Sequence, residues 1–120
     1  MQSLPPFDVF QIKQWFCYLA DMNPPLKNKP GKVRPVVVVQ MTDVLTPSLT
    51  FVPMTSELKE VSYFRVRINR RPGLQLLKDS DILIQEVHTL DRSLFIKELG
   101  PLLPAEIAKI SQGLKFYFGW

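Results

Sequence analysis

Cysteine and histidine are nearly absent from this sequence, and their scarcity removes several classes of site. Cys17 is the single cysteine and His88 the single histidine among 120 residues. One cysteine cannot form an intramolecular disulfide, and its surroundings lack the spacing of a zinc site. One histidine excludes an HxxxH metal site and a two-histidine acid and base pair within one chain. We therefore expect a reducing, cytoplasmic compartment and a site without metal or other cofactor.

Long apolar runs are also missing. No stretch approaches the length needed to cross a bilayer, and the first residues carry no basic segment of a secretion signal. The composition, 46% hydrophobic and 22% charged, is that of an ordinary globular protein. We expect one domain over residues 1–120, neither exported nor embedded in a membrane. Fifteen Lys and Arg against eleven Asp and Glu give a formal charge of +4, which favours a polyanionic partner such as nucleic acid.

The first part of the chain predicts two short elements and a long loop. Phe7–Ile12 follows a double proline and predicts an opening strand. Gln14–Ala20 is apolar and aromatic, and its length fits a strand or a short helix equally well. Asp21–Lys32 contains three prolines, a glycine and three lysines, which predicts a long loop.

The central part predicts further strands. Four successive valines, Val36–Val39, are typical of a strand buried on both faces. After a turn over residues 43–48, Leu49–Met54 alternates as a strand does. Apolar residues alternate with basic and aromatic ones over 63–68, which predicts a half-exposed strand, and the NRRPG sequence at 69–73 predicts a turn. Asp81–Val87 is rich in Ile and Leu and predicts one more strand.

The C-terminal part predicts a helix. Five apolar residues are spaced four, three, four and three apart, and Pro104 suits the first turn. They are Leu103, Ile107, Ile110, Leu114 and Tyr117. Several short strands followed by one helix predict a mainly β protein with α structure, a small antiparallel barrel or curled sheet whose open flank the helix covers.

Five segments carry a family resemblance through the order in which they occur. They are FDVFQI, GKVRPVVVVQ, FVPMTS, DILIQEVHTLDRSLF and LGPLLPAEIAKISQGL. In this order they resemble the MazF/PemK family of type II toxins over nearly the whole chain. The resemblance implies a half-open barrel of the CcdB/MazF type, a homodimer, and sequence-selective cleavage of single-stranded RNA. It also implies neutralisation by a cognate antitoxin that fills the RNA groove.

The resemblance implies a catalytic pair as well. Arg34 matches the arginine of the family's RP motif, and Thr55 matches the threonine after the strand that ends in VP. RNA supplies its own nucleophile, the ribose 2′-hydroxyl, so the protein need only align it and stabilise the charge on phosphorus, without a metal. The Arg34 guanidinium can hold two phosphate oxygens, and the Thr55 hydroxyl can donate to the same oxygens. The products would be a cyclic phosphate and a free 5′-hydroxyl.

Other residues are candidates for support or for RNA contact. Ser56, Gln85 and His88 could assist the pair, and His88 stands where the family usually has Arg or Lys. Lysines in the long loop could steer RNA, and the basic and aromatic face over 63–67 could hold phosphates and stack bases, although a solvated face is the plainer interpretation. These candidate RNA contacts are Lys27, Lys29, Lys32, Tyr63, Arg65 and Arg67.

Two other functions remain open at this point. A CcdB-like protein that poisons DNA gyrase without catalysis would share the fold, and FYFGW loosely resembles its aromatic ending. CcdB-type chains lack the GKVRPVVVV and VPMTS pair. The third possibility is a degenerate family member that binds an antitoxin and regulates transcription.

Overall fold

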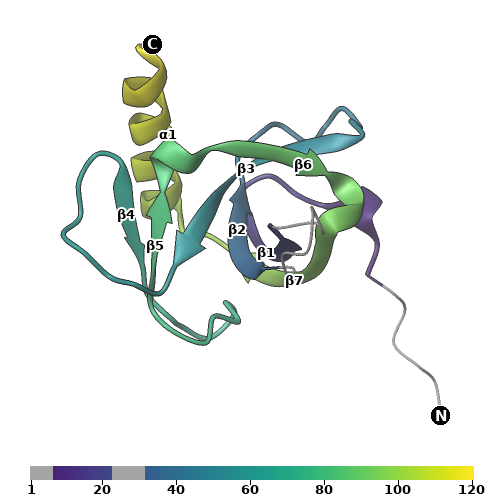
Figure 1. Cartoon of the computed structure of the whole chain (residues 1–120), viewed down its shortest axis with the longest axis horizontal. Coiled ribbons are helices and arrows are strands. Elements are labelled where there is room, and N and C mark those ends of the chain that lie inside the picture. The colour runs from purple at the N-terminus through teal and green to yellow at the C-terminus, as the bar shows by residue number, and fades with distance from the viewer. Residues whose placement is uncertain (1–6, 23–31) are drawn as a thin grey trace.

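A computed structural model describes residues 7–22 and 32–120 of the chain, which form a strongly curved antiparallel sheet and a C-terminal helix (Figure 1). Short 3₁₀ turns are labelled η. The elements in chain order are η1 (Val9–Gln11), β1 (Phe16–Asp21), β2 (Val33–Val38), β3 (Ser48–Thr55), β4 (Arg65–Ile68), β5 (Ser80–Leu83), η2 (Ile84–Glu86), β6 (His88–Asp91), η3 (Arg92–Leu94), β7 (Phe95–Pro101) and α1 (Pro104–Phe118).

The sheet is antiparallel at every pairing and does not close on itself. Its strand order is β4-β5-β3-β2-β1-β7, and β6 pairs with β3 off this path. Strand β3 pairs with two strands on the same edge: its first half pairs with β6, and its last residues pair with β5. This mainly β architecture with a C-terminal helix confirms the predicted fold class.

Apolar side chains fill both sides of the sheet. One cluster contains Val37, Val52 and Ile110 and lies towards α1, whereas the other contains Val36 and Val38 and lies inside the curl. Three of the four valines of β2, Val36, Val37 and Val38, are completely buried, whereas Val33 at its start is exposed. The prediction of a strand buried on both faces is therefore confirmed, and Gln14–Ala20 resolves as strand β1 rather than a helix.

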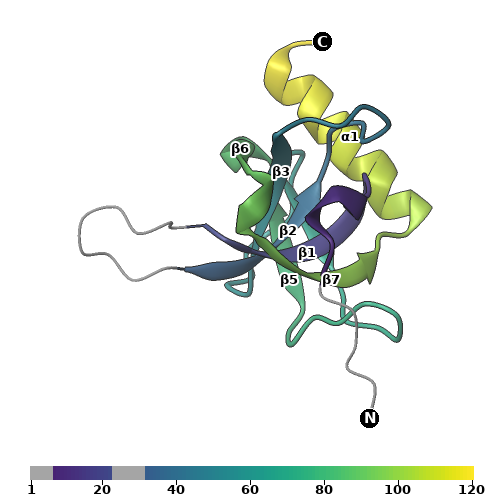
Figure 2. The same cartoon turned by 90° about the vertical axis from the view of Figure 1, so that its right-hand side faces the viewer.

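Helix α1 packs against β4 and η2 along one side of the sheet (Figure 2). Pro104 occupies its first turn, as predicted, and Glu106 accepts a hydrogen bond from the Leu103 N–H in a capping box. Ile110 is completely buried, but the predicted apolar stripe is exposed at both ends, at Leu103 and Tyr117. The helix projects beyond the sheet, so its last turn has less to pack against.

The predicted strand Phe7–Ile12 is wrong. This segment holds the single turn η1, whose start is fixed by the Asp8 carboxylate, which accepts a hydrogen bond from the Phe10 N–H at 2.9 Å. An aspartate bonded to the backbone two residues on stabilises a turn and competes with a strand ladder. Apolar content alone did not reveal this competition.

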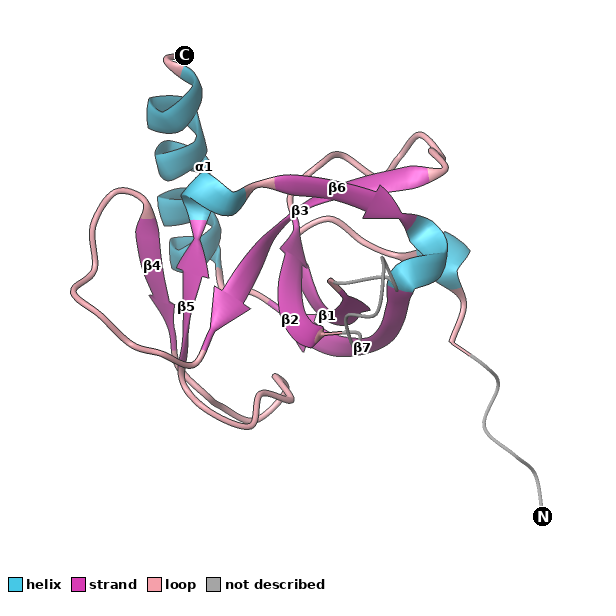
Figure 3. Cartoon of the chain, in the orientation of Figure 1, coloured by secondary structure: helices cyan, strands magenta, loops and turns pink. Residues whose placement is uncertain are grey.

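The predicted strand Asp81–Val87 is also wrong as one element, because β5 ends at Leu83 and η2 separates it from β6, which begins only at His88, beyond the predicted segment (Figure 3). The division lies opposite Pro53, between the part of β3 that pairs with β5 and the part that pairs with β6. Proline has no N–H to donate to a continuous ladder. The half-exposed strand over 63–68 is confirmed only from Arg65 onward, since Tyr63 lies in the preceding turn. Most of the predicted long loop, residues 23–31, lies outside the described residues.

Candidate functional site

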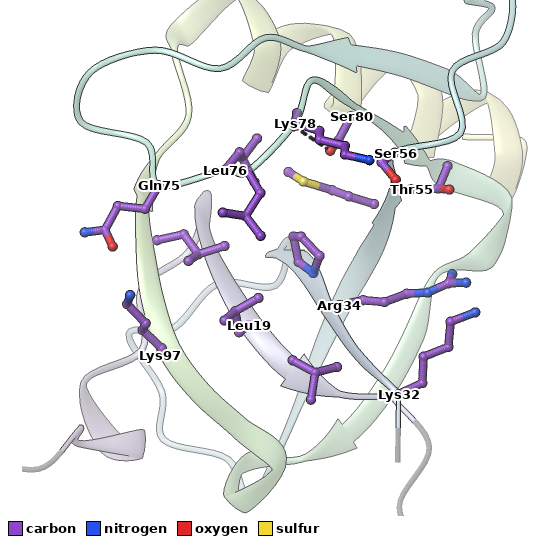
Figure 4. Close-up of a pocket in the computed structure, with 15 residues that line it drawn as sticks. Leu19, Lys32, Arg34, Thr55, Ser56, Gln75, Leu76, Lys78, Ser80 and Lys97 are labelled. Atoms are coloured by element: carbon purple, nitrogen blue, oxygen red, sulfur yellow. Dashed lines mark hydrogen bonds between the residues drawn. The ribbon is translucent and has the colours of Figure 1, made fainter. Parts of the chain in front are cut away.

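Strands β2 and β3 bring Arg34 and Thr55 together. Val36 pairs with Pro53 in the antiparallel register, and continuing that register by two residues sets Arg34 opposite Thr55. Both residues line the same depression, and the two side chains lie on one rim of it (Figure 4). The juxtaposition on which the predicted catalytic pair depends is therefore present.

The first depression has an apolar floor and a basic rim. Its volume is about 650 Å³, and Leu19, Met54 and Leu99 are among the residues of its floor. Its charged lining residues are all cations, namely Lys32, Arg34, Lys78 and Lys97. Such a lining attracts polyanions and offers an apolar surface on which a flat base can lie.

A second depression shares Arg34 and Thr55 with the first, so the pair lies on the boundary between the two. Its lining is more polar and includes Arg65, Gln85 and Glu86. A polymer that crosses this boundary would place one monomer in each depression. The linkage between the two monomers would then lie against Arg34 and Thr55. That arrangement suits a polynucleotide, whose phosphates alternate with bases.

The hydrogen bonds of the site leave its two key groups able to donate. The Thr55 Oγ1 accepts from the Glu57 N–H at 3.1 Å, which leaves the hydroxyl hydrogen able to donate to another acceptor. The guanidinium groups of Arg65, Arg67, Arg71 and Arg92 donate to protein oxygens. Within residues 7–22 and 32–120, the guanidinium of Arg34 has no such acceptor.

The other predicted site residues are divided between several places. Lys32 and Ser56 line the first depression with the pair, whereas Arg65 and Gln85 line the second. A different depression is formed beside α1 by Tyr63 and Arg67 together with Arg65. His88 is exposed on β6, and its ring contacts the edge of Phe51 with centroids 6.0 Å apart. Lys27 and Lys29 lie outside the described residues.

Sequence reasoning missed two lysines of the basic rim. Lys97 comes from β7, where it pairs with Leu19, and Lys78 comes from the loop before β5. That loop is held near β7 by a hydrogen bond from the Gln75 N–H to the Leu99 carbonyl at 2.9 Å. Neither lysine belongs to a motif or a charge cluster, so only strand pairing reveals their convergence with Arg34.

Two further properties of the described residues bear on the class of protein. They contain no group of three or more His, Cys, Asp or Glu side chains placed to hold a metal ion. None of the helices in this part of the chain combines the length and the apolar character needed to span a bilayer.

The fold defined above is that of known toxins. MazF from Deinococcus radiodurans superposes with a TM-score of 0.72 at 20% identity, over 91% of this chain and 97% of that one. A mycobacterial endoribonuclease solved in complex with its cognate antitoxin gives a TM-score of 0.68 at 18% identity, covering 90% and 93%. Likeness at this identity assigns the chain to a fold class.

Sequence comparison assigns the family. Residues 13–118 match the family described as PemK-like, MazF-like toxin of type II toxin–antitoxin system. A probable endoribonuclease MazF from Mycolicibacterium smegmatis is 30% identical over 90 residues, which are 74% of this chain and 83% of that protein. The chain belongs to the PemK-like, MazF-like toxin family, which confirms the resemblance found in its motifs. The name of this relative agrees with the predicted activity of an endoribonuclease.

Proposed function

We propose that this toxin is an endoribonuclease that cuts single-stranded RNA across the Arg34–Thr55 boundary without a metal ion. The observation that carries the proposal is that an arginine without a protein acceptor in the described chain and a hydroxyl whose hydrogen is able to donate line the same two depressions. The ribose 2′-hydroxyl gives up its proton as its oxygen attacks the adjacent phosphorus, the bond from phosphorus to the 5′-oxygen breaks, and the leaving 5′-oxygen takes up a proton. This leaves a cyclic phosphate and a free 5′-hydroxyl.

Each residue of the pair has a distinct task in this reaction. Arg34 binds two oxygens of the scissile phosphate and stabilises the negative charge that grows on them in the transition state. Thr55 donates its hydroxyl hydrogen to one of those oxygens, while its oxygen accepts from the Glu57 N–H. Ser56 and Gln85 lie in the adjoining depressions, where they could contact the flanking nucleotides.

The proposed partners follow from the same groove. Lys32, Lys78 and Lys97 attract the phosphates on either side of the cut. A cognate antitoxin that covers this surface would compete with RNA, and the mycobacterial relative has been solved with its antitoxin bound. We also propose a homodimer in the cytoplasm, a compartment consistent with a single buried cysteine.

The decisive experiment is cleavage of a mixed single-stranded RNA by the purified protein in EDTA, with end-group analysis of the fragments. We expect cutting at a restricted sequence, 2′,3′-cyclic ends, and a loss of at least a hundredfold in rate for Arg34→Ala and tenfold for Thr55→Val. Thr55→Ser keeps the hydroxyl and should retain most of the rate. Arg70→Ala is the matched control, because this exposed arginine lines neither depression. Cleavage that requires a divalent cation would contradict the mechanism.

The gyrase-poison alternative has one observation in its favour. Trp120 is 84% exposed at the end of α1 and stacks on Phe118 with ring centroids 4.9 Å apart. A supercoiling assay on the same preparation tests it, and we expect no inhibition. An intact fold that neither cuts RNA nor inhibits gyrase would support the degenerate regulator instead.

A further inference from the structure

Asp81 is a buried carboxylate next to the candidate site that the proposed reaction does not use. It lies on β5, where its register partners are Thr55 on β3 and Arg67 on β4. Its side chain is 0% exposed. Oδ2 accepts from the Nε of Arg65 at 2.7 Å and from the Lys59 N–H at 3.0 Å, while Oδ1 accepts from the Nε of Arg67. Two cations therefore compensate the burial of one charge.

The two arginines extend this network to the segment that follows the catalytic threonine. The Arg65 Nη2 donates to the Glu57 carbonyl, and the Arg67 Nη2 donates to the Lys59 carbonyl at 2.6 Å. Residues 57–61 belong to neither a helix nor a strand. Their backbone is instead tied to β4 and β5 by the Asp81 carboxylate and the two guanidinium groups.

The tied segment ends at the Thr55 hydroxyl. Glu57 uses its carbonyl to accept from Arg65 and its N–H to donate to the Thr55 Oγ1 at 3.1 Å. Fixing the Glu57 backbone therefore fixes the direction from which Thr55 accepts and restricts the directions in which its hydroxyl can donate. Catalytic groups lose rate when they are displaced by about 1 Å or reoriented, so such support has kinetic value.

We propose that Asp81, acting through Arg65 and Arg67, is a positioning residue that holds the Glu57–Lys59 backbone and so aims the Thr55 hydroxyl at the scissile phosphate. The expected effect on the cleavage rate rests on the proposed function. The fixing of the Glu57–Lys59 backbone rests on the hydrogen bonds alone. In this role Arg65 and Arg67 bind protein oxygens, whereas the sequence predicted that they bind the phosphates of RNA.

The kinetic test is a double-mutant cycle between Asp81→Asn and Thr55→Val, read as single-turnover cleavage rate and RNA dissociation constant. Asp81→Asn should lower the rate at least tenfold and change the dissociation constant less than twofold. In the Thr55→Val background Asp81→Asn should lower the cleavage rate less than twofold, because the hydroxyl that Asp81 positions is already absent. Additive losses, or a weaker affinity with an unchanged rate, would overturn the proposal.

A control separates positioning from simple destabilisation. Glu106→Gln breaks another, partly buried ion pair, in which both carboxylate oxygens accept from Arg71 at 2.7 and 2.8 Å. It lies at the start of α1, outside both depressions of the site. Glu106→Gln should lower the unfolding midpoint and leave the cleavage rate within twofold. An equal rate loss in both variants would assign Asp81 a merely structural role.

Amide hydrogen exchange at Glu57 tests the inference independently of activity. We expect this amide to be protected in the wild type and to exchange at least tenfold faster in Asp81→Asn, at a pH where both remain folded. If the wild type cuts no RNA but the Glu57 amide loses protection in Asp81→Asn, the proposed function fails and the positioning of Thr55 stands. If the wild type cuts RNA and Glu57 is unaffected, the positioning alone fails.

Discussion

Arginine residues of identical chemistry have different roles in this molecule. Arg92 is buried and donates to the carbonyls of Thr46 and Val9, each at 2.8 Å, so it ties η3 to the chain before β1. Arg71 anchors the start of α1 through Glu106. Arg34 is only partly buried and lines both depressions. The residue type alone therefore does not single out a candidate catalytic cation, and it is the motif around Arg34 that distinguishes this arginine from the others.

Cys17 is a potentially reactive residue whose surroundings suppress its reactivity. Burial and, to a smaller extent, the negative charge of Glu106 raise the pKa of its thiol, Arg71 opposes them, and together they bring it to about 12. At pH 8 the thiolate, which is the reactive form, is a fraction of roughly 10⁻⁴. We expect alkylation of the native protein to be at least a hundredfold slower than in denaturant, measured by mass spectrometry. Equal rates in the two conditions would show that this part of the core opens freely.

Two glycines show how strand β7 is placed against the turn between β4 and β5. Gly100 has φ +136°, and a Cβ added there would lie 2.1 Å from the Gly73 carbonyl oxygen. Gly73 itself has φ +87°, with open space where its Cβ would be. A side chain at Gly100 is therefore disfavoured by both backbone conformation and steric contact, whereas one at Gly73 is disfavoured by backbone conformation alone.

These glycines give a matched prediction for stability. Gly100→Ala should lower the free energy of unfolding by about 2 kcal/mol or more, because the backbone must move to relieve the overlap. Gly73→Ala should cost about 1 kcal/mol, the penalty of a left-handed conformation for an L-residue. Urea unfolding of both variants measures the difference. An equal loss would mean that the close approach of β7 to this turn does not matter for stability.

The charge of the whole molecule becomes useful only where the fold concentrates it. The net charge of +4 is modest, yet every charged residue that lines the first depression is a cation. Lys78 and Lys97 reach this rim from separate elements. Each phosphate that a lysine neutralises on single-stranded RNA contributes about 0.7 to the slope of log affinity against log salt concentration.

We therefore predict that Lys78→Gln and Lys97→Gln each reduce that slope by about 0.7 and weaken RNA binding similarly for all sequences. The measurement is RNA affinity at several salt concentrations, in the Arg34→Ala background so that the RNA stays intact. Lys109→Gln, which removes a lysine from the depression beside α1, is the control and should leave the slope unchanged. An unchanged slope for the first two variants would remove them from the RNA path.

Asp81 couples the stability of the whole molecule to pH. Burial by itself would raise the pKa of this carboxyl group, but hydrogen bonds from Arg67, the Lys59 N–H and Arg65 outweigh it and lower the pKa to about 2, from an ordinary value of 3.8. A lowered folded pKa means stability that is present above about pH 4 and lost as the pH falls towards 2. The contribution is on the order of 2 kcal/mol.

Comparing acid unfolding of the wild type and Asp81→Asn tests this coupling. The wild type should be the more stable protein at pH 6, and the difference should shrink between pH 4 and pH 2 as its carboxylate takes up a proton. Denaturant unfolding at each pH provides the free energies. Parallel curves over this range would show that the ion pairs contribute nothing that depends on protonation.

Local periodicity and motifs contiguous in the chain were enough to predict the family, the strand-rich architecture, the buried valine strand and the C-terminal helix, and they pointed to Arg34 and Thr55 as the candidate catalytic pair. Tertiary structure alone decided what depends on contacts between distant segments. Strand pairing brought Lys78 and Lys97 to Arg34, Pro53 on one strand interrupted its neighbour, and Asp81 became the partner of two arginines expected to contact RNA. Side-chain pairing across a sheet depends on register, and register is fixed when the whole core packs.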